Sequence, residues 1–391
     1  MMEKEEPHFL IVAGEASGDL HGAKLVQALF DIYPKARFTG MGGIRMQEAG
    51  VNTLFDIERM GAVGLVEIFA DFGHYFRVYR ALKKEIASRN YSAVILIDYP
   101  TLNLRLAKHS RRYDCPVYYF ISPQVWAWRK GRIKDIRKSV KKMFVILPFE
   151  EQMYRQEGVD AEFLGHPFID IVNPTRTREE SLQKFSLDSD LKTVGLFPGS
   201  RMNEINFLFD EILGAAEKIK KELGECQFLL PIAESIDFDM IHRKLAPNAL
   251  DIKILKGEAY DVMNTCDALI LASGSATLEA GIIGCPMVII YKLNPLTYWL
   301  ALILVNTPFY GLVNIVAGKG VAPELIQSEA NAENIAAETL KILKNPEYCQ
   351  EIRNRLLIIR EKLGNPGVMK AVAASMADSL SKLTPHEKIS L

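Results

Sequence analysis

Short apolar runs of strand length recur along almost the whole chain, and stretches of helical period separate most of them. In stretches such as Gly22–Ile32 and Leu102–Arg112, apolar residues return every three or four positions, which is typical of a helix with one buried face. Because strands and helices alternate, the pattern predicts an α/β fold with parallel sheets joined by right-handed crossovers. The runs expected to form strands are His8–Ala13, Ala93–Ile97, Val117–Ile121, Met143–Leu147, Thr193–Phe197, Gln227–Pro231, Asp251–Leu255, Ala268–Leu271 and Met287–Tyr291.

One polar interruption divides this alternation into two halves. The region Asp170–Leu191 is rich in charged and hydroxyl residues, and the alternation restarts at Thr193. A chain of 391 residues is also too long for one ordinary core. We therefore expect two doubly wound parallel-sheet domains facing across a cleft, formed by residues 1–175 and 176–391, with ligands bound beyond the carboxyl ends of the strands.

The last part of the chain shows helical periods. We expect Asn331–Leu383 to be helical and to be divided at Pro346 and Pro366, because proline cannot continue a helix from the preceding turn. This tail belongs to the second predicted domain and can pack back on the first.

Composition narrows the class of protein. The formal net charge is −1 and 49% of the residues are hydrophobic, so no overall electric field draws the chain to nucleic acid. The amino terminus lacks the basic region and cleavage site of a signal peptide, and the five cysteines form no closely spaced pair. These features predict a cytoplasmic globular protein with reduced thiols and no nucleic-acid partner.

The most informative stretch is ASGSATLEAG, Ala272–Gly281, which follows a strand-like run. It predicts a turn of small residues, Ser275, Ala276 and Thr277, at the start of a helix, where free N–H groups and the helix dipole favour an anion. We expect Glu279 in the first turn of this helix, where its carboxylate can accept hydrogen bonds from a ribose diol. The stretch therefore indicates a nucleotide-diphosphate site; the alternative is an ordinary capped helix after a buried strand.

A second turn of this kind follows the first strand of the second domain. The segment Phe197–Arg201 contains Gly199 and Ser200 and ends in an arginine. The Arg201 guanidinium can form charge-assisted hydrogen bonds to a phosphate and stabilise a departing diphosphate. Since parallel strands end at one edge of a sheet, we expect this turn to lie beside the SGSATLE turn, Ser273–Glu279. Two anion sites on one domain strengthen the nucleotide-diphosphate prediction.

Polar side chains also follow the first strand of the chain. The loop GEASGDLHG supplies Glu15, Ser17, Asp19 and His21, which can bind a polyhydroxyl substrate. For Ser17 and Asp19 the alternative is capping of the helix that follows. The glycine spacing differs from that of a dinucleotide-binding turn, and no acidic residue closes a second strand at the ribose position, which disfavours an NAD-dependent oxidoreductase.

A lone carboxylate, Asp98, ends another strand-like run. Partial burial at the end of a parallel strand raises the pKa of a carboxyl group and makes it a better general base at neutral pH. The alternative role is capping of the helix that starts after Pro100. Asn103 and Arg105 follow closely enough to join the same site.

Residues with the spacing of metal ligands are scarce. Asp188 with Asp190 and Asp237 with Asp239 have the DxD spacing that one class of glycosyltransferase uses for a divalent ion, but neither pair ends a predicted strand. The histidines form no HxxxH or HxH group. We therefore expect no catalytic metal and no other cofactor.

Three segments are candidates for contact with a membrane. Gly61–Phe76 is apolar with helical spacing, Leu296–Val316 is almost wholly apolar, and Arg129–Lys142 carries eight basic residues. Trp126 and Trp128, next to the basic stripe, can contact a sugar or a lipid interface. The alternatives are a buried core helix for the first segment, burial between domains or subunits or a membrane span for the second, and a solvated helix face for the third.

Several motifs become recognisable when they are taken together. GEASGDLHG, the MGG loop, IDYPTLNLRLAK, ISPQVWAWRKGRI, GHP at Gly165–Pro167, FPGSRMNEI, ASGSATLEAG and YKLNPLTYW follow one another between residue 14 and about residue 324. In this order they resemble the lipid-A-disaccharide synthase family, and SPQVWAWRKGRI and YKLNPLTYW are the most specific segments. Thr101 stands where the family pattern leads us to expect an acidic residue.

The resemblance implies a glycosyltransferase with two Rossmann-like domains, the GT-B fold. Its donor would be UDP-2,3-diacylglucosamine and its acceptor 2,3-diacylglucosamine 1-phosphate. The products would be the β-1,6-linked lipid A disaccharide 1-phosphate and UDP, formed with inversion and without a metal. The resemblance also implies peripheral association with the inner membrane, and the apolar segment 296–316 and the helical tail are compatible with a homodimer.

The resemblance assigns roles to most of the candidate residues. Asp98 would take the proton from the acceptor 6-hydroxyl, and Arg201 with the Ser275–Thr277 turn would hold the departing UDP. Glu279 would bind the ribose.

Other assignments stay open. Glu15 and Asn314 would orient sugar or phosphate groups, and the residues alone do not decide whether Asp98, Glu15 or His21 is the base. A UDP-sugar 2-epimerase or a transferase with a different lipid acceptor would show many of the same features, and so would a nucleotide-sugar-binding protein without turnover.

Overall fold

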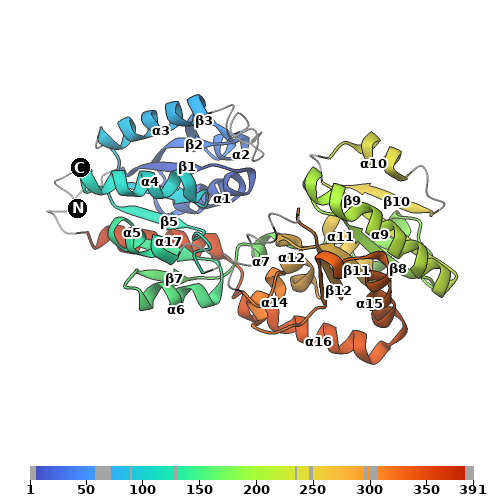
Figure 1. The fold of residues 1–391 in the computed structure, drawn as a ribbon. Coiled ribbons are helices and arrows are strands. Elements are labelled where there is room, and N and C mark those ends of the chain that lie inside the picture. Colours follow the sequence, from blue (N-terminus) through green and yellow to red (C-terminus); the bar gives the residue numbers. More distant parts are fainter. Residues whose placement is uncertain are drawn as a thin grey trace. The chain divides into compact units, whose positions relative to one another are not determined.

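The computed structural model describes residues 6–57, 72–88, 90–126, 130–233, 236–245, 250–294, 298 and 307–383. They form two compact units, each built on one parallel sheet with helices on its faces (Figure 1). This confirms the α/β fold of two doubly wound sheets. The first unit comprises the chain up to Pro167 together with the part from Asn365 onward, and the second is Phe168–Gly364.

The first unit contains a seven-stranded sheet in the order β3-β2-β1-β4-β5-β6-β7, and every neighbouring pair is parallel. The central strands are apolar throughout because helices cover both of their faces. The strands are β1 (His8–Ala13), β2 (Arg37–Gly42), β3 (Val51–Asp56), β4 (Ala93–Ile97), β5 (Val117–Phe120), β6 (Lys142–Val145) and β7 (Ala161–Phe163).

Alternate residues of these strands enter two separate cores. Phe9 and Ile11 of β1 pack with α1 and α17, whereas Leu10 and Val12 pack with α3, α4 and α5. The helices of this unit are α1 (Ala16–Ile32), α2 (Ile44–Glu48), α3 (Phe72–Ala87), α4 (Pro100–Ser110), α5 (Ile133–Ser139), α6 (Pro148–Gln156) and α17 (Val368–Ser381), with the short 3₁₀ turns η3 (Arg111–Tyr113) and η4 (Lys130–Arg132).

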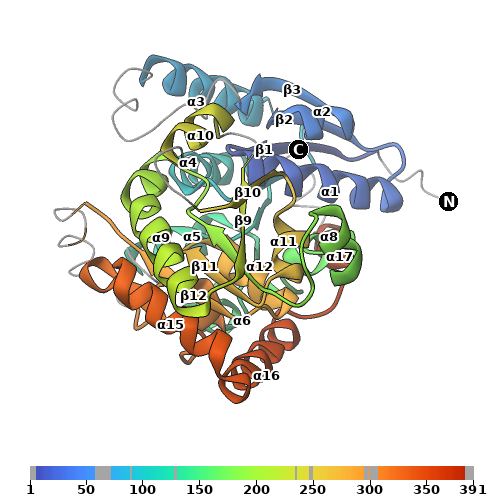
Figure 2. The ribbon, with the colours of Figure 1, turned by 90° about the vertical axis from the view of Figure 1, so that its right-hand side faces the viewer.

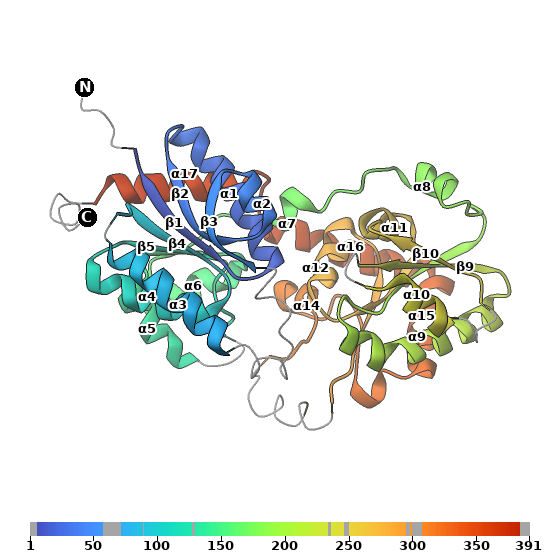
Figure 3. The same cartoon turned by 90° about the horizontal axis from the view of Figure 1, so that it is seen from above.

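The helix α17 comes from the far end of the chain and lies beside α1 (Figure 3). Its apolar residues complete the core on that face of the first sheet, and the Tyr118 hydroxyl of β5 donates a hydrogen bond to Ser379 Oγ over 3.1 Å. A second hydrogen bond joins Ser375 to Glu162 of β7. We expected a single boundary at residues 175 and 176; contacts within the chain divide it after Pro167 and again after Gly364.

The second unit contains a six-stranded parallel sheet in the order β10-β9-β8-β11-β12-β13. Its helices α9 and α15 lie together against the sheet (Figure 2), while α12 packs with α11, α14 and α16. The strands are β8 (Lys192–Phe197), β9 (Cys226–Ile232), β10 (Ile252–Lys256), β11 (Ala268–Ala272), β12 (Met287–Tyr291) and β13 (Glu324–Ile326). The helices are α7 (Phe168–Ile171), α8 (Arg178–Lys184), α9 (Met202–Leu223), α10 (Phe238–Leu245), α11 (Ala259–Thr265), α12 (Ser275–Ile283), α14 (Leu312–Ala317), η5 (Gln327–Glu329), α15 (Ala332–Lys344) and α16 (Pro346–Lys362).

Each sheet has one point at which the order of its strands reverses. In the first sheet β1 and β4 are neighbours there, and in the second β8 and β11 are neighbours. The loops that follow two such strands leave in opposite directions and open a crevice, where doubly wound sheets bind their ligands. The predicted site residues Glu15, Asp98, Arg201 and Glu279 all follow these four strands.

The membrane-contact predictions fall largely outside the described residues. Residues 61–71 lie outside them, as do residues 296–306 apart from Tyr298. In the ranges that the structure describes, no helix is both long and apolar enough to cross a bilayer.

Candidate active site

In the first unit the candidate site is centred on Asp98, directly after β4. Its side chain is partly buried, and burial together with the nearby Glu15 carboxylate raises the pKa of Asp98 to about 6, although the Tyr99 N–H favours the ionised form. A carboxyl group with this pKa is still mostly ionised at pH 7 and is a stronger base than an exposed aspartate. The helix α4 begins at Pro100 without a side-chain cap, so the structure does not show the alternative capping role of Asp98.

The backbone at this position is strained. Asp98 and Tyr99 have φ angles of +46° and +43°, in the left-handed region that non-glycine residues rarely adopt. Each such residue costs about 1–3 kcal/mol, and strain of this kind persists only where surrounding contacts hold it. The Tyr99 ring also lies against Gly14, where a Cβ atom would come within 2.3 Å of it, so only glycine fits at the end of β1.

The side chain of Asn103 joins this site through the backbone. Its Nδ2 donates to the carbonyl oxygens of Ile97, over 3.1 Å, and Asp98, over 2.8 Å. The Tyr119 hydroxyl of β5 donates to the same Asp98 oxygen over 2.6 Å. Arg105 instead points toward α3, where its Nη1 lies 3.4 Å from the Tyr75 hydroxyl.

The loop after β1 contributes less to the site than its polar residues suggest. The helix α1 begins at Ala16, and the buried Asp19 carboxylate accepts hydrogen bonds from the backbone N–H groups of Gly43, Arg45 and Met46. Asp19 therefore caps α2. This differs from both predicted roles, which were binding of a polyhydroxyl substrate and capping of the helix that contains Asp19. Ser17 is exposed on α1.

His21 is buried in the core of the first unit. Burial and the neighbouring Lys24 lower the pKa of His21 to about 4, so its imidazole is neutral at pH 7. The ring packs edge-on against Phe120, with centroids 6.3 Å apart, and Nδ1 has no hydrogen-bond partner among the described residues.

In the second unit the turn after β8 presents an arginine to solvent. The Arg201 side chain is 80% exposed, and its Nη1 lies 3.3 Å from Glu204 Oε1. The Glu204 carboxylate also accepts a hydrogen bond from the Ser200 N–H over 3.1 Å. Gly199 has φ +110°, and a Cβ atom there would lie 2.2 Å from Glu204 Oε2, so glycine is required for this turn.

The turn after β11 forms the amino terminus of α12. Ser275 is exposed at the first position of the helix, and Ala276 follows it. The Thr277 hydroxyl donates to the Gly274 carbonyl over 2.8 Å, so it supports the turn. Because β8 and β11 are neighbours in the sheet, this turn and that of Arg201 leave the same sheet edge.

Glu279 lies one turn further along α12 than expected. The helix begins at Ser275, so Glu279 is its fifth residue, and the prediction that it lies in the first turn is wrong. Its carboxylate accepts a hydrogen bond from the Tyr260 hydroxyl of α11 over 3.2 Å, and burial raises the pKa of Glu279. An acceptor held in this way is suited to a diol.

Asn314 is fully engaged with protein groups. Its Nδ2 donates to the Ala322 carbonyl, over 2.9 Å, and to Glu324, over 2.7 Å, while its Oδ1 accepts hydrogen bonds from the N–H groups of Val321 and Ala322. Glu324 in turn accepts from the N–H groups of residues 310 and 311 before α14. In this structure the Asn314 amide therefore fixes the loop that follows α14.

Comparison with known proteins decides the family. The model of the family described as "Lipid-A-disaccharide synthetase" matches residues 9–374. The chain belongs to the lipid-A-disaccharide synthase family. A curated lipid-A-disaccharide synthase of Geobacter sulfurreducens is 46% identical over 382 residues, which cover 98% of this chain and 100% of the relative. One from Coxiella burnetii is 40% identical over 364 residues, 93% of this chain and 96% of the relative.

As a member of this family, the protein is a glycosyltransferase of lipid A biosynthesis that uses a UDP-sugar donor and a sugar-phosphate acceptor. Among solved structures, a UDP-GlcNAc 2-epimerase of Neisseria meningitidis bound to UDP-GlcNAc aligns over 96% of this chain and 100% of that one, with a TM-score of 0.60 and 13% identity. The calicheamicin glycosyltransferase CalG4 aligns over 97% and 100%, with a TM-score of 0.61 and 13% identity. These similarities show the fold, which transferases and epimerases share, whereas the family match does not favour the epimerase alternative.

The candidate active site contains residues that the motifs did not single out. Tyr119, Tyr260 and Glu324 act on candidate residues from other strands and helices, so no local spacing marks them. Tyr291, at the end of β12, lies near Glu204 and Arg201, and burial is the main reason why its pKa is raised. Its phenol ends the buried strand β12 beside the turn that follows β11, which is the signal that could have identified it.

Residues of α6 hold Trp126, in the loop that follows β5. Trp126 Nε1 donates to Glu150 Oε1 over 3.0 Å, and its ring meets Phe149 edge-on at 5.3 Å. Glu150 is 1% exposed, and burial raises its pKa to about 7. Trp128 lies outside the described residues.

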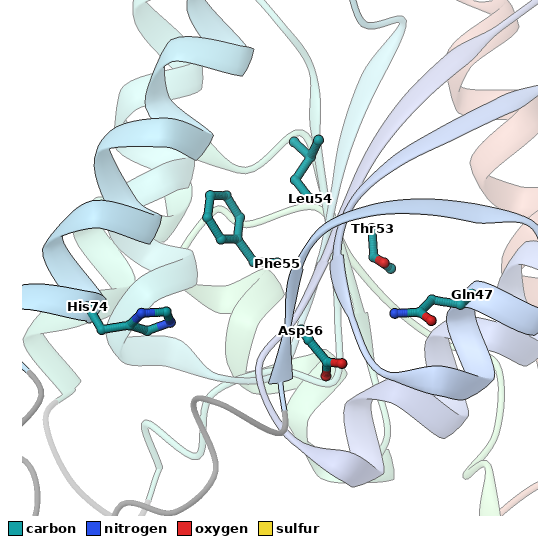
Figure 4. Close-up of a pocket in the computed structure, with 6 residues that line it drawn as sticks. All are labelled: Gln47, Thr53, Leu54, Phe55, Asp56 and His74. Atoms are coloured by element: carbon teal, nitrogen blue, oxygen red, sulfur yellow. The ribbon is translucent and has the colours of Figure 1, made fainter.

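A pocket of about 270 Å³ lies at the β3 edge of the first sheet. Residues of α2, β3 and α3 line it (Figure 4), namely Gln47, Thr53, Leu54, Phe55, Asp56 and His74. The strand β3 ends the sheet, and β2 and β1 separate it from β4. The pocket is therefore distinct from the candidate active site.

Proposed function

We propose that the protein transfers the diacylglucosaminyl group of UDP-2,3-diacylglucosamine to the 6-hydroxyl of 2,3-diacylglucosamine 1-phosphate. Family membership supports the reaction class, and the observation that carries the mechanism is the position of Asp98. It is a partly buried carboxylate, with a pKa of about 6, that follows β4 where the strand order reverses. The first unit would bind the acceptor and the second the UDP-sugar.

The chemistry is a single displacement. The Asp98 carboxylate accepts the proton of the acceptor 6-hydroxyl as that oxygen attacks the anomeric carbon of the donor. The bond from the anomeric carbon to the diphosphate oxygen breaks, UDP leaves, and the α-linked donor gives a β-1,6 linkage. Because the leaving diphosphate gains negative charge, the Arg201 guanidinium and the amino terminus of α12 at Ser275 and Ala276 stabilise the transition state.

Asp98 fits the role of base better than the two alternatives. His21 is buried against Phe120, and its pKa of about 4 makes it a weaker base than Asp98. Glu15 is exposed beside Asp98. We propose that Glu15 orients the acceptor and keeps the pKa of Asp98 raised.

The remaining roles follow from the contacts of each residue. Glu279, paired with Tyr260, would accept hydrogen bonds from the ribose, and Ser200 and Gly199 would shape the turn that presents Arg201. Asn314 would act by holding the loop before β13, because protein groups occupy its amide.

We further propose that the enzyme works in the cytoplasm, bound peripherally to the inner membrane, where acylated substrates reside. The exposed basic side chains of α5, Lys134, Arg137 and Lys138, support electrostatic attraction to an anionic leaflet. From the sequence, Val66 and Phe69 are the candidate apolar contacts, and replacing both with charged residues should reduce co-sedimentation with anionic vesicles while leaving the fold intact. We also propose that the protein forms a homodimer, and the mass of the particle in solution, measured by sedimentation velocity, tests this.

The reaction itself is tested by UDP release from UDP-2,3-diacylglucosamine with and without the acceptor, and with EDTA. We expect release that requires the acceptor and is insensitive to EDTA. Turnover without acceptor would contradict the transferase and favour an epimerase or hydrolase. UDP binding without any turnover would favour a nucleotide-sugar-binding protein.

A further inference from the structure

Two buried donors act on the backbone of Asp98 rather than on its carboxylate. The Tyr119 hydroxyl and Asn103 Nδ2 both donate to the Asp98 carbonyl oxygen, over 2.6 and 2.8 Å, and Asn103 Nδ2 also reaches the Ile97 carbonyl. Tyr119 and Asn103 are each 0% exposed. They come from different elements, β5 and α4, and converge where the backbone turns left-handed.

We propose that Tyr119 and Asn103 are positioning residues for the glycosyl transfer, because they hold the Asp98–Tyr99 turn in the conformation that aims the Asp98 carboxylate at the acceptor hydroxyl. This inference rests on the proposed function, in which Asp98 is the base. Neither residue touches substrate in this arrangement; both act through the Asp98 carbonyl.

The strain in the turn is the first reason. Without these donors, Asp98 and Tyr99 would relax from positive φ toward the ordinary right-handed or extended regions. A change of backbone dihedral at Asp98 redirects its side chain, and transfer to an oriented hydroxyl is sensitive to displacements of about 1 Å.

The polar character of the two residues is the second reason. Asn103 Oδ1 is buried and has no hydrogen-bond partner in the described part of the chain, an arrangement that is unfavourable for stability. Tyr119 lies in the apolar core that also contains Leu96 and Leu102, and its hydroxyl donates to the Asp98 carbonyl. Both polar side chains therefore direct a donor from a buried position to the same backbone oxygen.

The chain offers a matched control for the hydroxyl of Tyr119. Tyr118 is the preceding residue of β5, faces the opposite core, and donates its hydroxyl to Ser379 Oγ over 3.1 Å. Tyr119→Phe and Tyr118→Phe therefore each remove one buried hydroxyl and one hydrogen bond from the same strand, but only the first touches Asp98.

The experiment measures acceptor-dependent UDP release by the full chain from pH 5 to 8.5. For Tyr119→Phe we expect kcat to fall about tenfold, with KM unchanged. The acid limb of its kcat/KM profile, where the rate falls because the base is protonated, should move to lower pH. A carboxylate released from the turn is better solvated, so the pKa of Asp98 falls and it becomes a weaker base. For Tyr118→Phe, kcat should stay within about twofold of the parent and the limb should not move, since Asp98 is untouched.

The shift of the limb reports on Asp98 because its titratable neighbours are known. Glu15, from the loop after β1, raises the pKa of Asp98 and is unchanged in both variants. Among the described residues, Tyr119 of β5 also interacts with Asp98, and burial holds the pKa of that phenol well above its ordinary value, so it is neutral across this range.

The outcomes separate this inference from the function on which it rests. If Asp98→Asn retains full activity, Asp98 is not the base and the mechanism fails, whatever the tyrosine variants do. If Asp98→Asn is inactive but Tyr119→Phe matches Tyr118→Phe in kcat and in the acid limb, the mechanism stands and the positioning role is wrong. Asn103→Leu should reproduce the loss and the shift of Tyr119→Phe; where it does not fold, the tyrosine pair decides.

Discussion

Two carboxylates in the candidate site, Asp98 and Glu279, have similar positions but different neighbours. Asp98 and Glu279 both lie partly buried after strands at which the sheet order reverses, and burial raises the pKa of each. Their neighbours differ: Asp98 faces a second carboxylate, whereas Glu279 accepts a hydrogen bond from a phenol. In the proposed function the first arrangement strengthens a base and the second orients an acceptor, so the same chemical group, a carboxylate, serves two purposes.

Replacement of Asp98 should separate activity from stability. In Asp98→Asn we expect kcat to fall by about 10²–10⁴-fold, the range that a general base contributes. The folded state favours protonated Asp98, because its pKa is raised from 3.8 to about 6, so the stability provided by protonation is lost as the pH rises through about 6. The amide removes that unfavourable ionisation, and the variant should melt at pH 7.5 no lower than the parent. A lower melting temperature in thermal denaturation would show that the carboxylate stabilises the fold.

The pH dependence of the parent enzyme follows from the same pKa. We expect kcat/KM to fall below a pH of about 6 and to be level above it, because the base must be ionised. Removing the like charge in Glu15→Gln should move this limb to lower pH, since Glu15 raises the pKa of Asp98. Initial rates at subsaturating substrate give the acid limb of kcat/KM for the parent and for the variant. An unchanged limb in Glu15→Gln would show that Glu15 does not raise the pKa of Asp98.

Glu279 makes a prediction about the nucleotide alone. The parent should bind UDP about tenfold more tightly than 2′- or 3′-deoxy-UDP, because the ribose hydroxyls donate to a charged acceptor. Glu279→Gln should lose most of that preference, as measured by titration calorimetry. Tyr260→Phe, which removes only the hydroxyl paired with Glu279, is the control and should retain the preference. Equal discrimination by Glu279→Gln and the parent would place the ribose elsewhere.

At the scale of elements, the sequence predicted most of the strands inside the two sheets, although its apolar runs did not include the interior strand β2 and did include β10, which lies at a sheet edge. The runs at β1, β4 and β12 coincide with the observed strands because central parallel strands are apolar throughout. The strands β3 and β13 lie at sheet edges and β7 has three residues, so none of them forms a long apolar run. Their pattern does not distinguish them from loops.

The candidate site was predictable to a similar extent. Glu15, Asp98, Arg201 and Glu279 stand out because each follows a strand-like run, which is a local property of the sequence. Tyr119 and Tyr260 could not be identified in this way, because their partners come from other elements. The role of Asp19 also required the tertiary structure, which shows that the helix it caps is α2 rather than its own.

The turn between β8 and α9 yields a prediction at this scale. In Gly199→Ala, the new Cβ would lie 2.2 Å from Glu204 Oε2, so the carboxylate that holds Ser200 and Arg201 must move. We expect UDP affinity to fall about tenfold or more as this anion site is disordered. Gly224→Ala is the matched control, because Gly224 also has positive φ but no described atom lies within 4 Å of a Cβ there. It should cost only about 1 kcal/mol of stability and leave UDP binding unchanged. Equal losses of affinity in the two variants would contradict the role of the turn.

At the scale of the whole molecule, the return of α17 to the first unit is the main departure from a simple division into two halves. Val368, Val372 and Met376 enter the core that also contains Phe9 and Ile11 of β1. Hydrogen bonds from Ser375 and to Ser379 join the helix to β7 and β5. The first unit is thus assembled from two stretches of chain that are separated by the entire second unit.

Removal of α17 should therefore destabilise one unit selectively. A chain that stops after Gly364 would leave the apolar face of β1 and β5 uncovered, and we expect it to aggregate or to be digested rapidly up to Pro167. The second unit should resist protease in the same experiment, because its sheet and helices are continuous in sequence. A chain that stops after Leu383 is the control, and equal protease resistance of both truncated chains would contradict the structural role of α17.

The same connection has a consequence for the biogenesis of the enzyme. During translation, residues 168–364 emerge from the ribosome before the helix that completes the first unit, although most of that unit precedes them in the chain. The second unit can fold as it is synthesised, whereas the nascent first sheet waits with one apolar face only partly covered, by α1, until α17 is released. The first unit should therefore be the part that engages chaperones on the ribosome, and pauses in synthesis before residue 365 should lower the yield of active enzyme.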